Sequence, residues 1–155
     1  MTNQQLTAQA VDRYADMVWR LALARTGNRA DAEDVFQEVF LRHLRHGHKL
    51  TSPEHEKAWL IRCTIHRSAS LLGAAHRRRD LPLEEAAALG VEDRDRSVYA
   101  AVLALPQKYR TAIHLHYYEG LTVAEIAQAT GARQGTVKSW LSRGRDLLAD
   151  ALKDG

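Results

Sequence analysis

The chain has 155 residues, 45% of them hydrophobic, and a net charge of +3, so it can bury a core and is not globally disordered. Its single cysteine, Cys63, excludes an internal disulfide and offers no zinc-binding framework. The N-terminus lacks a signal-peptide pattern and no apolar stretch reaches membrane-spanning length, so we expect a cytoplasmic protein with no membrane partner.

Three helices are predicted in the first half of the chain, where apolar residues recur at helical spacing. The first ends at Gly27, and Asn28 can cap the second, which ends at Gly47. Ser52 and Pro53 form a strong start signal, because a capping residue is followed by proline at the first helical position. The third helix is predicted to end near the basic run at 77–79 and to bury one face, formed by Ala58, Ile61, Ile65, Ala69 and Leu72.

The segment 80–95 differs from the sequence on either side of it. It is acidic, contains Pro82 and Gly90, and has no sustained apolar stripe. We therefore predict a linker that is mobile in the free protein. It divides the chain into an N-terminal domain, 1–79, and a C-terminal domain, 96–155.

The second half is predicted to form short helices. One precedes Pro106, which opens a second, and Gly120 closes that second helix. The second helix should turn four residues inward, namely Tyr109, Ile113, His116 and Tyr117. No strand-like alternation is present, so the sequence predicts an all-α fold of two small helical domains joined by a flexible linker.

The segment TVAEIAQATGARQGTVKSWLSR has the form of a helix-turn-helix. Thr122 and Glu125 form a capping box, Gly131 suits the turn, and Val137 anchors the second helix in the core. Arg143 and Arg145 would grip the DNA backbone. The leading end of this second helix would read base edges in the major groove through Arg133, Gln134, Thr136, Lys138 and Ser139. The alternative is an ordinary helical hairpin with solvated charges.

Three stretches resemble extracytoplasmic-function (ECF) sigma factors of bacterial RNA polymerase. LPQKYRTAIHLHYYEGLTVAEIAQATGARQGTVKSWLSRGRDLL resembles their promoter-reading C-terminal domain. DAEDVFQEVFLRHLRH resembles their polymerase-binding helix, and EHEKAWLIRCTIHR resembles their helix for the promoter −10 element. The resemblance implies a sigma factor that binds core RNA polymerase and promoter DNA. It allows for an anti-sigma factor as a partner. The sequence has no glycine-rich phosphate loop and no nucleophile–base arrangement, so we expect no catalytic activity and no cofactor.

The resemblance also implies roles for residues in the first half. The helix at 31–45 would dock on the clamp helices of the polymerase β′ subunit through Asp34, Gln37 and Glu38. The alternative is a solvated face steadied by a pair between Glu38 and Arg42.

The helix from Pro53, together with the loop at 46–55, would hold the opened −10 strand. Trp59 would either stack near bases or belong to the core. The −10 contacts would come from Trp59, Arg62, His66 and Arg67. The basic run Arg77, Arg78 and Arg79 would contact the DNA backbone, or would be a solvated helix end.

Several positions depart from the family pattern. His66, Ser70 and Gly73 stand where the family commonly has Asn, Asp and Arg, so the −10 sequence does not follow. Trp140 replaces a frequent Arg, and Arg133 replaces a Ser-type cap, which leaves the −35 preference open as well.

Two other functions compete with this interpretation. One is a stand-alone helix-turn-helix regulator that binds palindromic DNA as a dimer. The other is a helical metalloenzyme. Cys63 and His66 lie one turn apart and could ligate zinc, but no two further ligands stand at matching spacing. For the histidines near the loop the sequence favours a solvated loop over a metal site. They are His43, His46, His48 and His55.

Overall fold

The computed structural model describes residues 1–71 and 93–153, with only the backbone course given for 93–96. Every regular element among the described residues is helical, which confirms the predicted all-α fold. Contacts divide the chain into two compact units, residues 1–79 and 80–155. None of the described helices combines the length and the apolar character that a bilayer-spanning segment needs.

Two features of the sequence fall mostly outside the described residues. They are the basic run Arg77, Arg78 and Arg79 and the predicted linker 80–95. Only the end of that linker is described. Helix α6 begins there, at Asp93, three residues before the boundary expected from the sequence.

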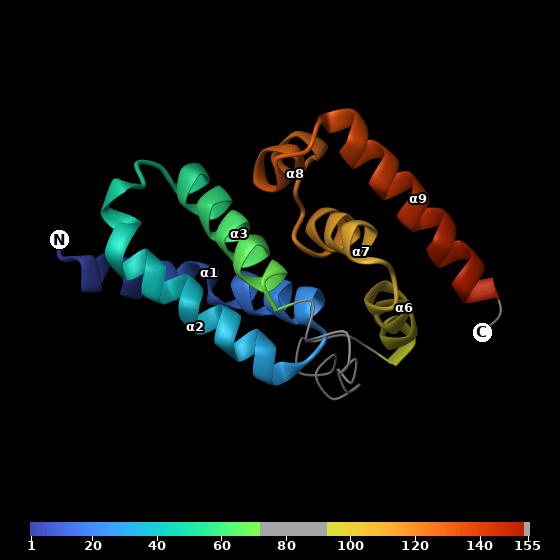
Figure 1. Ribbon diagram of the computed structural model, residues 1–155, viewed down its shortest axis with the longest axis horizontal. Helices are drawn as coiled ribbons and strands as arrows, with labels where there is room; N and C mark the ends of the chain where they lie inside the picture. Colours follow the sequence, from blue (N-terminus) through green and yellow to red (C-terminus); the bar gives the residue numbers. More distant parts are fainter. Residues whose placement is uncertain (72–92, 154–155) are drawn as a thin grey trace. The chain divides into compact units, whose positions relative to one another are not determined.

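The first unit is a three-helix arrangement in which each helix packs against the other two (Figure 1). Its elements are α1 (Asn3–Thr26), α2 (Arg29–His46), the short 3-10 helix η1 (Gly47–Lys49) and α3 (Pro53–Ala69).

The helix ends of this unit follow the signals in the sequence. Gly27 ends α1 with a left-handed φ of 74°, a conformation that glycine adopts without steric cost. The Asn28 side chain accepts a hydrogen bond from the Asp31 amide at 2.9 Å. Ser52 caps α3 by accepting from the His55 amide at 3.1 Å. These bonds satisfy amides at helix starts that have no partner within the helix.

The buried face of α3 differs from the predicted one. Ala69 is exposed and Ala58 and Ile65 are half-buried, whereas Leu60 and Thr64 are buried. The Thr64 hydroxyl donates to the Leu60 carbonyl at 2.7 Å, so burying this polar side chain leaves its hydroxyl donor satisfied. The helix also ends at Ala69, well before the basic run.

A buried arginine ties α1 to the end of α3. Arg25 donates from Nε to the Ser68 hydroxyl at 2.9 Å and from Nη2 to the Ile65 carbonyl at 3.2 Å. Burial lowers the pKa of Arg25 to about 10, so the guanidinium stays charged at neutral pH. These bonds engage groups in the last turn of α3, and they fix that end of the helix against α1.

In the second unit the longest helix, α9, packs against α6, α7 and α8 (Figure 1). The elements are α6 (Asp93–Leu103), α7 (Gln107–Ile113), the π-helical turn η2 (His114–Tyr118), α8 (Val123–Thr130) and α9 (Gln134–Lys153).

The π-helical turn reverses part of the predicted inward face. His116 is half-buried and Tyr117 is 54% exposed, whereas His114 is buried and bonds the Glu119 carboxylate at 2.9 Å. A π turn closes its hydrogen bond over five residues, and here the Glu119 amide donates to the His114 carbonyl at 3.2 Å. The wider turn changes which side chains face the core, so a pattern based on 3.6 residues per turn selects the wrong face.

Candidate nucleic-acid interfaces

The helix-turn-helix is formed by α8, α9 and the turn between them. Thr122 and Glu125 make the predicted capping box at the start of α8. Gly131 ends α8 with a φ of 77°, and its amide donates to the Ala127 carbonyl at 2.9 Å. Val137 is completely buried. Local signals in the sequence therefore place both helices of the motif correctly.

All five predicted base-reading residues are exposed around the leading end of α9. They are Arg133, Gln134, Thr136, Lys138 and Ser139. The Arg133 carbonyl accepts the first bond of the helix, from the Val137 amide at 3.0 Å, so Arg133 occupies the capping position. Val137 faces inward while Lys138 beside it faces solvent. The arrangement presents two cationic side chains and an amide where a helix can enter a DNA groove.

The two predicted backbone contacts, Arg143 and Arg145, are exposed further along α9. Arg145 also donates to the Tyr117 hydroxyl at 3.1 Å, a bond that links α9 to the π-helical turn. Between them Gly144 is buried against α7, where an added Cβ would lie 2.8 Å from Ile113 Cγ1. The glycine therefore permits a close approach of α7 and α9 that no larger residue would allow without a shift.

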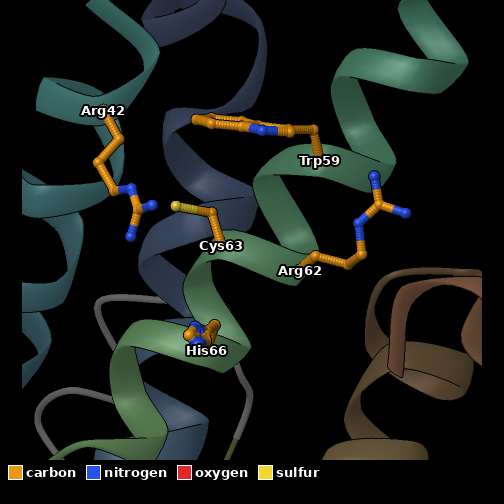
Figure 2. A pocket seen from close by; sticks show the side chains of 5 residues that line it. All are labelled: Arg42, Trp59, Arg62, Cys63 and His66. Atoms are coloured by element: carbon orange, nitrogen blue, oxygen red, sulfur yellow. The ribbon is translucent and has the colours of Figure 1, made fainter. Parts of the chain in front are cut away.

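A pocket of about 180 Å³ lies in the first unit, between α2 and α3 (Figure 2). It brings together three of the four predicted −10 residues, Trp59, Arg62 and His66, and adds Cys63 from the same helix and Arg42 from α2. The fourth, Arg67, does not line the pocket. Its Nε atom is buried without a hydrogen-bond partner in the described part of the chain.

Trp59 is half-buried, so part of its indole packs within the first unit and part remains accessible. Its ring packs edge-on against the His43 imidazole, with centroids 5.9 Å apart and planes at 73°. The rest of the indole lines the pocket (Figure 2). The buried His43 ring thus supports the Trp59 ring from the interior of the unit.

His43 contradicts the expectation of a solvated loop histidine. It is fully buried in α2 and bonds the Thr7 hydroxyl through Nδ1 and the Glu56 carboxylate through Nε2, each at 2.9 Å. A Cβ on Gly47 would lie 2.5 Å from the imidazole, so the glycine makes room for the ring. One side chain therefore joins all three helices. The sequence did carry a sign that His43 is buried, because the apolar stripe formed by Ala32, Val35 and Val39 continues at helical spacing to position 43.

The pocket also changes the roles of two other side chains. In the described part of the chain Arg42 forms no ion pair with Glu38, contrary to the alternative considered for this face, and it lines the pocket instead. Burial raises the pKa of the Cys63 thiol, an effect that the nearby Arg42 charge partly offsets.

Among the described residues no group of three or more His, Cys, Asp or Glu side chains could hold a metal ion.

Sequence comparisons match both halves of the chain to known proteins. Residues 10–78 match Sigma-70 region 2, and residues 95–148 match Sigma-70 region 4. The chain is 33% identical to the ECF RNA polymerase sigma factor SigE of Mycolicibacterium smegmatis, over 93% of the chain and 60% of SigE. It is 30% identical to the ECF RNA polymerase sigma factor SigW of Bacillus subtilis, over 98% of the chain and 91% of SigW. The chain belongs to the ECF sigma factor family.

The fold of this sigma factor also matches a solved structure. The sigma factor RpoE of Bartonella quintana, in complex with the anti-sigma factor NepR, is similar with a TM-score of 0.69. The match covers 94% of this chain and 96% of RpoE at 20% sequence identity. Matches to both sigma regions in the family's order favour a sigma factor over a stand-alone helix-turn-helix regulator.

The outer face of α2 in this sigma factor carries the residues predicted to bind polymerase. Asp34 and Gln37 are exposed and Glu38 is half-buried. Leu41, one turn further along, is 49% exposed, which makes it one of few large apolar side chains in the described residues that face solvent. Leu41 is not among the residues that the sequence predicted for polymerase binding. A single exposed leucine is ordinary on a protein surface, so Leu41 adds an apolar side chain to this face but does not by itself mark a binding site.

Proposed function

We propose that the two units of this sigma factor divide promoter recognition between them. The first unit would bind core RNA polymerase through α2 and hold the unpaired −10 strand at the pocket between α2 and α3. The second unit would read the −35 element with the leading end of α9. The observation that carries this proposal is the set of exposed polar residues at the leading end of α9, from Arg133 to Ser139. Val137 among them is buried and anchors the helix in the core.

The mechanism in this proposal is binding energy alone. Core polymerase supplies the catalysis, and the sigma factor supplies sequence selection in the cytoplasm, with no catalytic activity or cofactor of its own. Backbone contacts position the complex, and base contacts select the site. An anti-sigma factor is a further expected partner, of the kind that RpoE has in NepR.

Transcription in vitro tests the function as a whole. The purified chain is added to core polymerase with a library of random promoter fragments, and start sites are mapped. We expect transcripts that begin a fixed distance downstream of two shared sequence elements. Initiation that is unchanged from core polymerase alone would contradict the proposal.

The face of α2 formed by Asp34, Gln37, Glu38 and Leu41 would dock on the clamp helices of the β′ subunit. We expect the double reversal Asp34→Lys with Glu38→Lys to weaken core binding by about tenfold or more, because it places like charges opposite the partner. Fluorescence anisotropy with labelled sigma factor measures the affinity.

A matched control reverses Asp12 and Asp16, two exposed acids on α1, and changes the net charge equally. The control should bind core polymerase as the parent chain does. Equal binding by the α2 variant and the parent would show that polymerase docks elsewhere.

The α9 residues should separate into two groups in their effect on DNA binding. Replacing Arg133 or Gln134 by Ala should change which −35 bases are preferred, by about 1–3 kcal/mol for each good hydrogen-bonded pair with a base that the substitution removes. Replacing Arg143 or Arg145 should weaken all sequences alike and flatten the salt dependence, because a phosphate contact releases counterions whatever the sequence.

Holoenzyme binding across a library of −35 variants, at two salt concentrations, measures both effects. An unchanged base ranking in the Arg133 and Gln134 variants, together with an altered ranking in the Arg143 variant, would mean that the other end of α9 enters the groove.

A further inference from the structure

The hydroxyl group of Tyr117 and the guanidinium group of Arg145 meet at the surface of the second unit. Arg145 donates from Nη1 to the Tyr117 hydroxyl oxygen at 3.1 Å, and both side chains are exposed. Because the tyrosine oxygen accepts this bond, its own proton remains to be donated, and the guanidinium keeps further N–H donors. In the described part of the chain no carboxylate pairs with Arg145. Two adjacent donor groups that carry one positive charge suit an anion with several oxygens.

The ring of Tyr117 is held in place by the turn that carries it. The His116 ring packs edge-on against it, with centroids 4.8 Å apart and planes at 86°. His116 is fixed in turn, because its Nδ1 atom donates to the carbonyl of the buried Leu121 at 2.8 Å. The Leu121 amide donates to the Leu115 carbonyl at 2.9 Å. A ring that is fixed before binding loses little conformational freedom when its hydroxyl contacts a partner.

Arg143 and Arg145 leave α9 on opposite sides of its buried face. Gly144 between them is buried, and two residues span about 200° around a helix. Lys138 lies seven positions before Arg145 and within about 20° of it around the axis, so these two share one side. A helix about 10–12 Å in diameter fills a major groove about 12 Å wide, so its two sides face the two backbones of the duplex.

We propose that Tyr117 and Arg145 together bind one phosphate of the DNA strand on their side of α9, and that Arg143 contacts the opposite strand. The phosphate would accept hydrogen bonds from the tyrosine hydroxyl and from the guanidinium. The inference rests on the proposed reading of the −35 element by α9. It adds Tyr117, which the sequence predicted to face inward, and it assigns the two arginines to different strands.

The position of the pair favours a phosphate over a base edge. In a helix-turn-helix the N-terminal residues of the recognition helix contact the bases, and the first helix crosses the backbone. Arg145 lies 12 positions after Arg133, about 18 Å along the axis, and therefore far from the base-reading end. Helix α8 begins at Val123, only six residues after Tyr117, so the pair would lie beside the strand that α8 crosses.

The experiment uses holoenzyme assembled from core polymerase and the full chain, with a promoter duplex recovered from the transcription assay. Uncharged methylphosphonate linkages replace the phosphates of the −35 element one at a time, on each strand. The parent holoenzyme should bind more weakly wherever a contacted phosphate is replaced. Arg145→Ala should abolish this weakening at one linkage, and Tyr117→Phe should lessen it at the same linkage. Arg143→Ala should abolish it at a linkage on the other strand.

Binding to unmodified promoter DNA gives each variant a different signature. Arg145→Ala should reduce the slope of log affinity against log salt by about 0.9, because one fewer counterion is released. Tyr117→Phe keeps the charge and the ring, so it should preserve that slope and weaken binding by about 2-fold to 10-fold through the lost hydroxyl. The two effects should be less than additive, because both groups contact the same phosphate.

Two control variants match these changes. Tyr109→Phe removes a hydroxyl from α7 in the same unit, and Lys153→Ala removes a positive charge from the exposed end of α9. Both should bind every duplex as the parent chain does.

The outcomes separate this inference from the function on which it rests. Promoter binding that does not depend on the −35 sequence would overturn the proposed function itself. Dependence on that sequence, with unchanged methylphosphonate sensitivity in Tyr117→Phe or Arg145→Ala, would overturn the inference and leave the function standing. So would linkages for Arg143 and Arg145 that lie on one strand. Weaker binding of Arg145→Ala to core polymerase without DNA would identify a protein contact and would also overturn it.

Discussion

Replacing Val137 by Asp should unfold the second unit of this sigma factor and abolish promoter binding for every −35 sequence. Val137 is fully buried on the inner face of α9, one residue from the exposed Lys138. A carboxylate there would lose its hydration, and among the described residues of α8 and α9 no basic side chain is buried beside it. The expected destabilisation of about 4 kcal/mol or more is a large part of the stability of a small domain.

Hydrogen exchange resolved by helix measures this effect without interference from the first unit. Protection should disappear in α7, α8 and α9 and persist in α1, α2 and α3. The control is Lys138→Asp, which introduces the same carboxylate at the neighbouring exposed position and should preserve protection while weakening DNA binding. Native protection of α9 in Val137→Asp would show that this face of the helix is not core.

The second large effect is expected at His43. Replacing it by Ala removes a fully buried ring that bonds Thr7 on α1 and Glu56 on α3. We expect the stability of the first unit to fall by about 2–4 kcal/mol, from the cavity and from the carboxylate left without its partner. Glu56 is 17% exposed, so water offsets part of that second cost.

Urea-dependent hydrogen exchange of α1, α2 and α3 measures the change in stability. His46→Ala, at the exposed end of the same helix, is the matched control and should change stability by no more than about 0.5 kcal/mol. The same small effect at both positions would contradict a structural role for His43.

A further consequence concerns Trp59, whose ring packs against the His43 imidazole. Its fluorescence should shift in the His43 variant before unfolding begins.

The helix ends and the helix-turn-helix could be predicted from the sequence because their causes are local. Thr122 and Glu125 lie three residues apart, and the side chain of each accepts a hydrogen bond from the other's backbone amide. Gly131 adopts the left-handed φ that the turn needs without help from any other residue. Each signal is complete within a few residues. The same holds for Ser52 with Pro53 and for the outward direction of Lys138.

The remaining features depend on contacts between distant segments. The hydrogen bonds of His43 come from residues 36 positions before it and 13 positions after it, so nothing beside it in the sequence reveals its partners. The pocket role of Arg42 requires α2 and α3 to pack together. The inward direction of His114 follows from a π turn, and an apolar pattern read at 3.6 residues per turn carries no sign of one.

The close approach at Gly144 gives α9 the mechanics of a lever. The glycine is buried near the middle of a 20-residue helix, where Ile113 leaves no space for a Cβ, so it acts as a fulcrum. Arg133 lies 11 positions away, about 16 Å at 1.5 Å per residue, so a tilt of about 5° at the fulcrum would move it by roughly 1.4 Å. That displacement exceeds the tolerance of a hydrogen bond to a base edge. In the proposed reading of the −35 element by the leading end of α9, Gly144 would therefore help to set the precision from a position 11 residues away from Arg133.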